Sequence, residues 1–192
     1  SSDLVYDRVP YCTSASCGSL GLDYAKTVQK PVRFAKAAVL DADSKQVLMD
    51  NLRTDAAGRV SFSVAVDQAF IVRVYAESSG DGAASWGLRI VDNNGADQEG
   101  TYPLYVLESG AINANAVTEP VTLQAESGWG LTKYTQTRSA APFAILDSMI
   151  SATLYALSGR STLAFAPVDV YWSVANTLDS VGTSYYSGTY IM

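Results

Sequence analysis

The feature that most constrains the fold of this chain is a helical pattern inside a C-terminal quarter that carries almost no charge. Between residues 139 and 157, apolar side chains recur at three- and four-residue spacing at Phe143, Leu146, Ile150, Leu154 and Leu157. That period is typical of a helix with one face packed on a core. Ser139 can cap the first turn, Pro142 suits that turn, and Gly159 provides a natural end. We therefore predict one main helix over residues 139–157.

The segment around this helix has too few charges for an ordinary protein surface. Residues 139–192 contain four charged side chains, Asp147, Arg160, Asp169 and Asp179, whereas about a quarter of the residues in soluble domains are charged. This composition predicts that residues 127–192 are the truncated start of a second domain. Another body of protein would cover this segment, and a second copy of the chain is one candidate.

The first 126 residues show the periodicity of short β-strands. Apolar runs or alternation mark strands at residues 4–9, 32–40, 46–52, 60–66, 70–76, 86–91, 104–107 and 117–125, with a loop at 78–84, and two later strands at 168–174 and 184–192. Residues 54–62 (TDAAGRVSF) predict a hairpin turn, because Asp55 can bond the turn backbone and Gly58 can take a positive φ. We expect a mainly β fold, with an antiparallel β-sandwich over residues 1–126 and a small α+β segment over residues 127–192.

Composition excludes several classes of function. The net charge of −6, without clustered Lys or Arg, disfavours binding to nucleic acid. No uninterrupted apolar run reaches the roughly 18 residues that span a bilayer, so we expect no membrane span. The chain has no histidine, which removes histidine-based catalysis and the commonest zinc ligand. We therefore expect no cofactor in this chain.

The two cysteines bear on where the protein works. Cys12 and Cys17 enclose only four residues, Thr-Ser-Ala-Ser. Such a pair is most simply a local disulfide in an exported protein, and the alternative is two free thiols in the cytosol. We favour the disulfide, and with it a secreted, periplasmic or cell-surface location.

Three segments resemble a known β-sandwich domain. Residues 32–40 (VRFAKAAVL), 54–62 (TDAAGRVSF) and 70–76 (FIVRVYA) are similar to the carboxypeptidase regulatory-like, or transthyretin-like, domain. Domains of that family are non-catalytic attachments of secreted peptidases and surface proteins. The resemblance implies a transthyretin-like sandwich without catalytic residues of its own.

A second resemblance spans most of the chain. The N-terminal region of exported bacterial zinc metallopeptidases looks like this sequence at residues 21–25, 30–33, 85–86, 91–93, 127–130, 137–147 and 182–187. In that family a His-Glu-x-x-His zinc helix follows shortly after the equivalent of residues 190–192. This chain lacks that helix, so the resemblance implies zinc only for a missing domain. It also implies that the chain is the non-catalytic front of such a protein. Residues 127–192 would then pack against the missing C-terminal catalytic domain, if not against another copy of the chain.

Several polar residues allow a functional and a structural interpretation. Asp147, the one charge within the predicted helix, is either a carboxylate that serves an absent active site or orients a ligand, or a structural partner of Arg138 or of a backbone donor at a domain seam. We favour the structural interpretation. Asp92, Asn94 and Asp97 offer oxygen ligands for calcium, but they fit no EF-hand spacing, and turn formation is favoured.

Aromatic and helix residues in the last third are the candidate interface. Trp129, Trp172, Tyr185 and Tyr186 can line a sugar or peptide groove or pack inside a domain seam, and we favour burial. The full set of candidate interface residues is Trp129, Arg138, Phe143, Asp147, Ile150, Leu154, Trp172, Tyr185 and Tyr186.

The sequence is compatible with three functions. The preferred one is a non-catalytic module that positions a catalytic domain or binds a peptide substrate or the cell surface. The alternative is an adhesin-like or pilus-type subunit whose sandwich exchanges strands with a neighbour. The third is a hydrolase that uses carboxylates alone.

Overall fold

The computed structural model describes residues 2–12, 21–114, 120–177, 179 and 190–191. The strands are β1 (Ser2–Arg8), β2 (Val28–Pro31), β3 (Lys36–Asp41), β4 (Val47–Arg53), β5 (Arg59–Val60), β6 (Ala69–Tyr75), β7 (Glu77–Gly80), β8 (Trp86–Asp92), β9 (Val106–Glu108), β10 (Ile112–Asn113), β11 (Val121–Ala125), β12 (Trp129–Gly130), β13 (Lys133–Tyr134), β14 (Val168–Trp172) and β15 (Tyr190–Ile191). The helices are a short 3-10 helix η2 (Tyr24–Lys26) and α1 (Ala140–Gly159).

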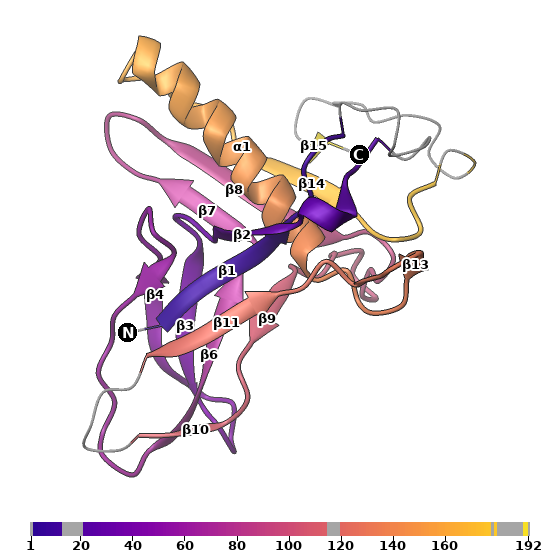
Figure 1. The fold of residues 1–192 in the computed structure, drawn as a ribbon. Coiled ribbons are helices and arrows are strands. Elements are labelled where there is room, and N and C mark those ends of the chain that lie inside the picture. The colour runs from indigo at the N-terminus through magenta and orange to yellow at the C-terminus, as the bar shows by residue number, and fades with distance from the viewer. Residues whose placement is uncertain (1, 13–20, 115–119, 178, 180–189, 192) are drawn as a thin grey trace.

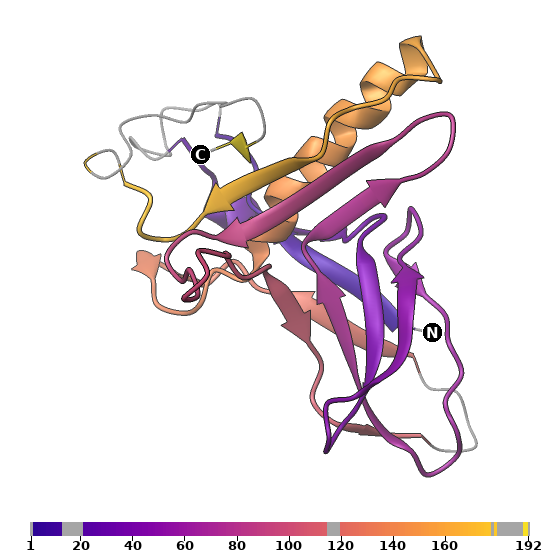
Figure 2. The same ribbon diagram turned by 180° about the vertical axis from the view of Figure 1, so that it is seen from behind.

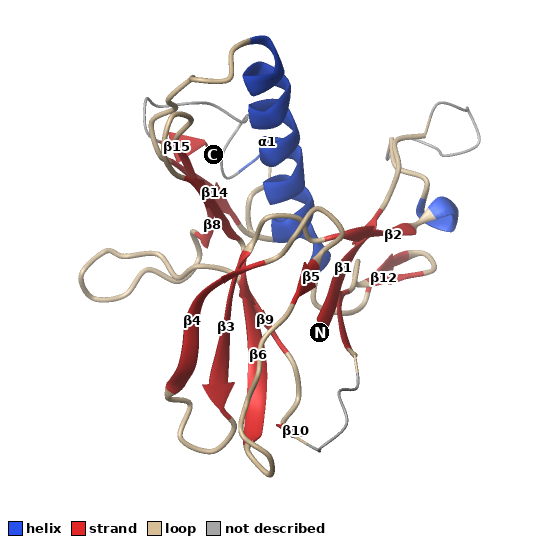
Figure 3. Ribbon diagram, turned by 90° about the vertical axis from the view of Figure 1, so that its left-hand side faces the viewer, coloured by secondary structure: helices blue, strands red, loops and turns tan. Residues whose placement is uncertain are grey.

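Two sheets make up the lower body of the molecule in Figure 1, and Figure 3 shows them as two layers. The first has the order β11–β1–β2, with β5 also paired to β1, and the second has the order β10–β6–β3–β4, with β9 also paired to β6. Side chains that alternate along the strands share one buried core. Leu4 and Tyr6 come from β1, Val39 from β3, and Val72 and Val74 from β6.

A third sheet and α1 form the upper part. This sheet has the order β15–β14–β8–β7, and Figure 2 shows β14 running beside β8. Helix α1 contacts β1, β8 and β7. The buried cluster of the lower sheets therefore continues through Leu88 and Ile90 on β8 to Leu146 and Ile150 on α1. Because β8 and β14 pair across residue 126, strands from both sides of the predicted domain boundary share this sheet, and the division into two domains stays a prediction.

The mainly β prediction is confirmed: within the described parts of the chain the structure is 41% strand and 15% helix, with one main helix. Several sheets are antiparallel, as predicted. The antiparallel prediction for residues 1–126 fails at one pair, because β1 and β11 run parallel, and β14 also pairs in parallel with β8 and β15. The strand predicted at residues 60–66 ends at Val60. The residues after Val60 alternate between apolar and polar but form no strand, and Val66 is largely exposed.

The loop predicted at residues 78–84 begins instead as strand β7, antiparallel to β8. Gly80 accounts for this difference. A Cβ at Gly80 would overlap the ring of Trp86, which lies directly opposite in the ladder. Glycine in a sequence commonly predicts a loop, but here the absence of a side chain makes room for a large ring on the partner strand.

Helix α1 is covered along only part of its length. Phe143, Leu146 and Ile150 are buried, whereas Leu154 is 36% exposed and Tyr155 is 83% exposed. Figure 1 shows the end of α1 extending past β1. The first three turns are thus a core element, and the last two turns present apolar side chains to the surface.

By length and composition alone, α1 could also cross a membrane. The sequence-based expectation concerned continuous apolar runs, and Asp147 and scattered serines interrupt the apolar pattern of α1. The helix meets the broader criterion because it is apolar on average. Core helices meet the same criterion, and the buried side chains of α1 belong to the main core. The absence of a membrane span therefore stays a prediction.

Candidate functional site

Predicted interface residues meet where α1 begins. Trp129 lies on β12 and Trp172 ends β14. Arg138 lies two residues before α1, and Phe143 lies in its first turn. Two tight strands, β12 and β13, bring Trp129 back toward the helix, with Gly130 packed against the Thr135 side chain.

These residues belong to a continuous aromatic row. We define it as Tyr24, Trp129, Tyr134, Arg138, Trp172 and Tyr105, all of which are half-buried. The ring centroids of Tyr24 and Trp129 lie 3.7 Å apart and nearly parallel, and Trp129 meets Tyr134 edge-on at 5.1 Å. At the other end, the rings of Trp172 and Tyr105 are 5.5 Å apart. A half-exposed series of rings is the composition that protein interfaces favour.

Arg138 joins the two halves of this row. Its guanidinium carbon lies 4.1 Å from the ring centroid of Tyr134 and 5.4 Å from that of Trp172. Within the described residues, Arg138 forms no ion pair. Because stacking uses the faces of a guanidinium, the N–H donors around its edge stay available for an oxygen acceptor.

A cavity of about 240 Å³ adjoins Arg138, and we call it the α1 cavity. Val106, Phe143, Trp172 and Val174 give it an apolar lining, and Asp92 is also among the residues that line it. A second hollow of about 170 Å³ lies beyond Arg138 and is also lined by Tyr134. The row therefore offers one partly open, mainly apolar site beside a cation.

The predicted calcium ligands are used in turns. Asp92 Oδ1 accepts a hydrogen bond from the Asn94 backbone at 2.9 Å. Asp97 Oδ1 accepts from the backbones of Glu99 at 3.0 Å and Thr101 at 2.8 Å. Across the described parts of the chain, no three His, Cys, Asp or Glu side chains are close enough to hold a metal. The calcium site stays a prediction, and the turn interpretation has direct support.

Asp92 also affects Tyr105 in the aromatic row. Burial, together with the nearby Asp92 carboxylate, holds the pKa of the Tyr105 hydroxyl well above its usual value. The hydroxyl is therefore neutral at physiological pH, and it donates a hydrogen bond to the backbone carbonyl of Trp172 at 3.0 Å.

Asp147 pairs with Arg33, so the predicted pairing with Arg138 is wrong. Its Oδ1 lies 2.7 Å from Arg33 Nε and 2.5 Å from Arg33 Nη2, and its Oδ2 accepts the Tyr6 hydroxyl at 2.9 Å. Burial first, and then the Asp147 carboxylate, raise the pKa of Tyr6. Arg33 Nη2 also donates to Ser151 Oγ at 2.8 Å. This junction fixes α1 to β1 and to the chain after β2.

The remaining predicted interface residues do not belong to the aromatic row. Ile150 belongs to the main core, while Leu154 lies on the bare end of α1. Tyr185 and Tyr186 lie outside the described residues. Cys17 does too, so its disulfide with Cys12 stays a prediction.

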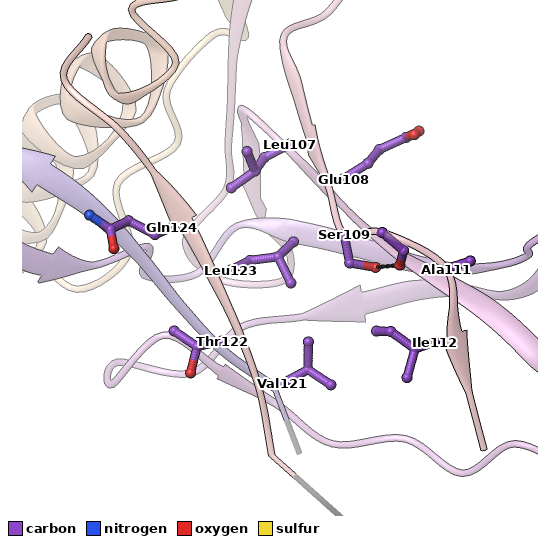
Figure 4. A pocket seen from close by; sticks show the side chains of 10 residues that line it. Leu107, Glu108, Ser109, Ala111, Ile112, Val121, Thr122, Leu123 and Gln124 are labelled. Carbon is purple, nitrogen blue, oxygen red and sulfur yellow. Dashed lines mark hydrogen bonds between the residues drawn. The ribbon is translucent and has the colours of Figure 1, made fainter. Parts of the chain in front are cut away.

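A groove of about 310 Å³ lies between the edges of the two lower sheets. Figure 4 shows Leu107 and Ile112 on one side and Val121 and Leu123 on the other. β11 is an edge strand of the first sheet, and β9 and β10 pair only with β6 among the described strands. The sandwich is thus open along this side.

Sequence reasoning missed Tyr24, Tyr134 and Tyr105 of the row, and also Arg33 and Tyr6. Tyr24 and Tyr134, whose hydroxyl oxygens are 2.6 Å apart, are separated by 110 positions. Arg33 and Asp147 are separated by 114 positions. No local period or spacing encodes such contacts. The only related signal in the sequence is the presence of many tyrosines.

The chain matches no protein-family model, no curated protein and no solved structure. The resemblances to a carboxypeptidase regulatory-like domain and to a zinc metallopeptidase therefore stay expectations. Function has to be argued from the contacts of the site itself.

Proposed function

We propose that this chain is a non-catalytic module of an exported bacterial protein of the zinc-metallopeptidase type, and that it binds extended peptide at the aromatic row. The proposal includes a transthyretin-like sandwich over residues 1–126 and a secreted, periplasmic or cell-surface location. Zinc would belong to a separate catalytic domain. The peptide would come from a substrate or from that domain.

The observation that carries the proposal is Arg138, stacked between two rings at the mouth of the α1 cavity. Its edge donors match a peptide carbonyl or carboxylate, and the stacked rings hold the guanidinium in place before binding. Phe143 and Val106 line a cavity large enough for an apolar side chain. Peptide recognition combines these two elements, a polar anchor and a side-chain pocket.

Replacing Arg138 with methionine should weaken peptide binding at least about tenfold, because the stacked cation is the polar anchor of the site. Methionine keeps the length and apolar packing of the side chain, so the fold should be retained. A random dodecapeptide library displayed on phage is enriched on the unmodified chain. Fluorescence anisotropy then measures the affinity of the recovered peptide for each variant.

Arg160→Met is the matched control, since Arg160 is exposed at the opposite end of α1 and should leave the affinity unchanged. Circular dichroism checks that both variants fold. Equal affinity of the Arg138 and Arg160 variants for the peptide would refute the proposal, as would failure of the library to yield any peptide. A recovered sequence that occurs in the parent protein's catalytic domain would identify the domain as the source.

A second candidate is the strand-exchanging surface subunit, and the groove in Figure 4 favours it. Two sheet edges border a partly apolar trough there, as a donated strand requires. If a second copy fills the groove, light scattering should show a dimer, and Val121→Asp should return it to a monomer. A monomer at all concentrations would remove this candidate.

No comparable observation favours a carboxylate hydrolase, because Asp147 is held by Arg33 and Tyr6 rather than by a second acid.

A further inference from the structure

A pocket of about 570 Å³ lies between α1 and the strands β1 and β2, and it concentrates positive charge on an acidic protein. Arg8, Lys30 and Arg33 line it, together with one carboxylate, Asp147. The whole chain carries only 13 Lys and Arg, and its net charge is −6. We call this site the basic pocket. None of its residues belongs to the aromatic row, although Arg8 also lines the hollow of about 170 Å³ beside Arg138.

The charges in the basic pocket are only partly balanced. Arg33 is neutralised by Asp147, at 2.5 Å. Arg8 and Lys30 form no ion pair with any described residue. Three cations and one anion therefore leave two positive charges facing the pocket. Uncompensated like charges repel each other, so an anionic ligand would relieve an unfavourable arrangement.

The sheet register keeps these cations on one wall. Lys30 on β2 lies directly opposite Tyr6 on β1, so both side chains project from the same face of the sheet. Arg8 is two residues beyond Tyr6 and shares that face. Tyr6 is fixed in turn by its hydrogen bond to Asp147. The wall is thus anchored at Tyr6, with the two unbalanced cations beside it.

The helical wall supplies few competing donors. Ser148 and Ser151 donate their hydroxyl protons to the helix carbonyls of Ala144 and Asp147, both at 2.8 Å. Binding of an anion therefore falls to Arg8, Lys30 and the outer N–H groups of Arg33. Two unbalanced charges match a group that carries close to two negative charges at neutral pH, as a phosphate monoester does.

We propose that the basic pocket binds the phosphate group of a small phosphate-bearing ligand. Arg8 and Lys30 bind the phosphate oxygens through charge-assisted hydrogen bonds. Asp147 holds Arg33 in place but does not contact the ligand favourably. The pocket volume exceeds that of inorganic phosphate, which leaves room for an organic group beside Pro31.

Isothermal titration calorimetry of the full chain with inorganic phosphate, glycerol 3-phosphate and succinate tests this proposal. Arg8→Gln and Lys30→Gln should each weaken phosphate binding about tenfold, the loss expected for one charged contact. The double variant should abolish binding. Tighter binding of glycerol 3-phosphate than of phosphate would identify an ester as the ligand, and equal binding would identify free phosphate.

Lys133→Gln is the control, because it removes one exposed cation from β13, outside the basic pocket. It should leave phosphate affinity unchanged, and thermal melting should show that all variants fold. Absence of binding to both phosphates, equal binding of succinate, or equal losses from Lys133→Gln and Lys30→Gln would each overturn the proposal. Peptide binding at Arg138 is measured separately, so failure of one site leaves the other intact.

Discussion

Replacing Ile150 with alanine should lower the free energy of unfolding by about 2–5 kcal/mol, the range for deleting a buried branched side chain. Ile150 is 2% exposed and packs in the cluster that joins α1 to the sheets. The surrounding residues come from two sheets and the helix, so the site cannot collapse easily around the missing atoms. Urea denaturation followed by circular dichroism measures the loss.

Leu154→Ala is the matched control, one turn further along the same face of α1. Its side chain is 36% exposed, so truncation removes less buried area and leaves no enclosed cavity. The expected loss is about 1 kcal/mol or less, partly offset by the better helix propensity of alanine. Equal losses for the two variants would show that the end of α1 is covered in solution. That result would contradict the burial of only the first three turns of α1.

The helix was the most predictable element of the fold, because its period is a property of the local sequence. The pattern predicted residues 139–157, and α1 covers Ala140–Gly159. Strands that alternate cleanly or form short apolar runs were also located, including β3, β6, β8 and β14. Such signals depend on side chains within a few positions of each other, and sequence displays those directly.

Pairing partners were not predictable in the same way. Residues 168–172 form a strand as expected, but nothing in their sequence specifies a parallel partner 80 positions earlier in β8. The few charges of the C-terminal quarter predict that its apolar side chains are covered by another domain or chain. Much of its apolar content instead covers sheets of this chain, through Phe143, Leu146 and Val170. Composition shows that a segment is buried, but it does not show against what.

The candidate site was predictable in part for the same reason. Trp129, Arg138 and Trp172 were selected for their residue types, and the structure brings them into one row. The tyrosines that complete the row come from η2, β13 and the segment before β9, where tyrosine has no distinguishing local pattern. Charge offered no better signal. Asp147 pairs with Arg33, which is far away in the sequence, and not with Arg138, which is only nine positions away.

Replacing Asp147 with alanine should lower the free energy of unfolding by about 2 kcal/mol, because two groups lose their acceptor together. Asp147 is 21% exposed and Arg33 27%, so water compensates only partly for the lost ion pair. The Tyr6 hydroxyl is buried and would keep no described partner. A buried donor left unsatisfied costs about 1–3 kcal/mol by itself.

One further variant separates charge from hydrogen bonding in this junction, and a second, at an exposed ion pair elsewhere, is the control. Asp147→Asn keeps an oxygen acceptor for Tyr6 and should recover about half of the loss, whereas Asp169→Ala breaks the exposed pair with Arg89 and should cost no more than about 0.5 kcal/mol. A double-mutant cycle of Asp147→Asn with Arg33→Met should give a coupling energy of about 1 kcal/mol or more. Urea denaturation supplies all four terms of that cycle. If Asp147→Ala costs no more than Asp169→Ala, the junction is an ordinary surface contact, and α1 is held to the sheets by its apolar face alone.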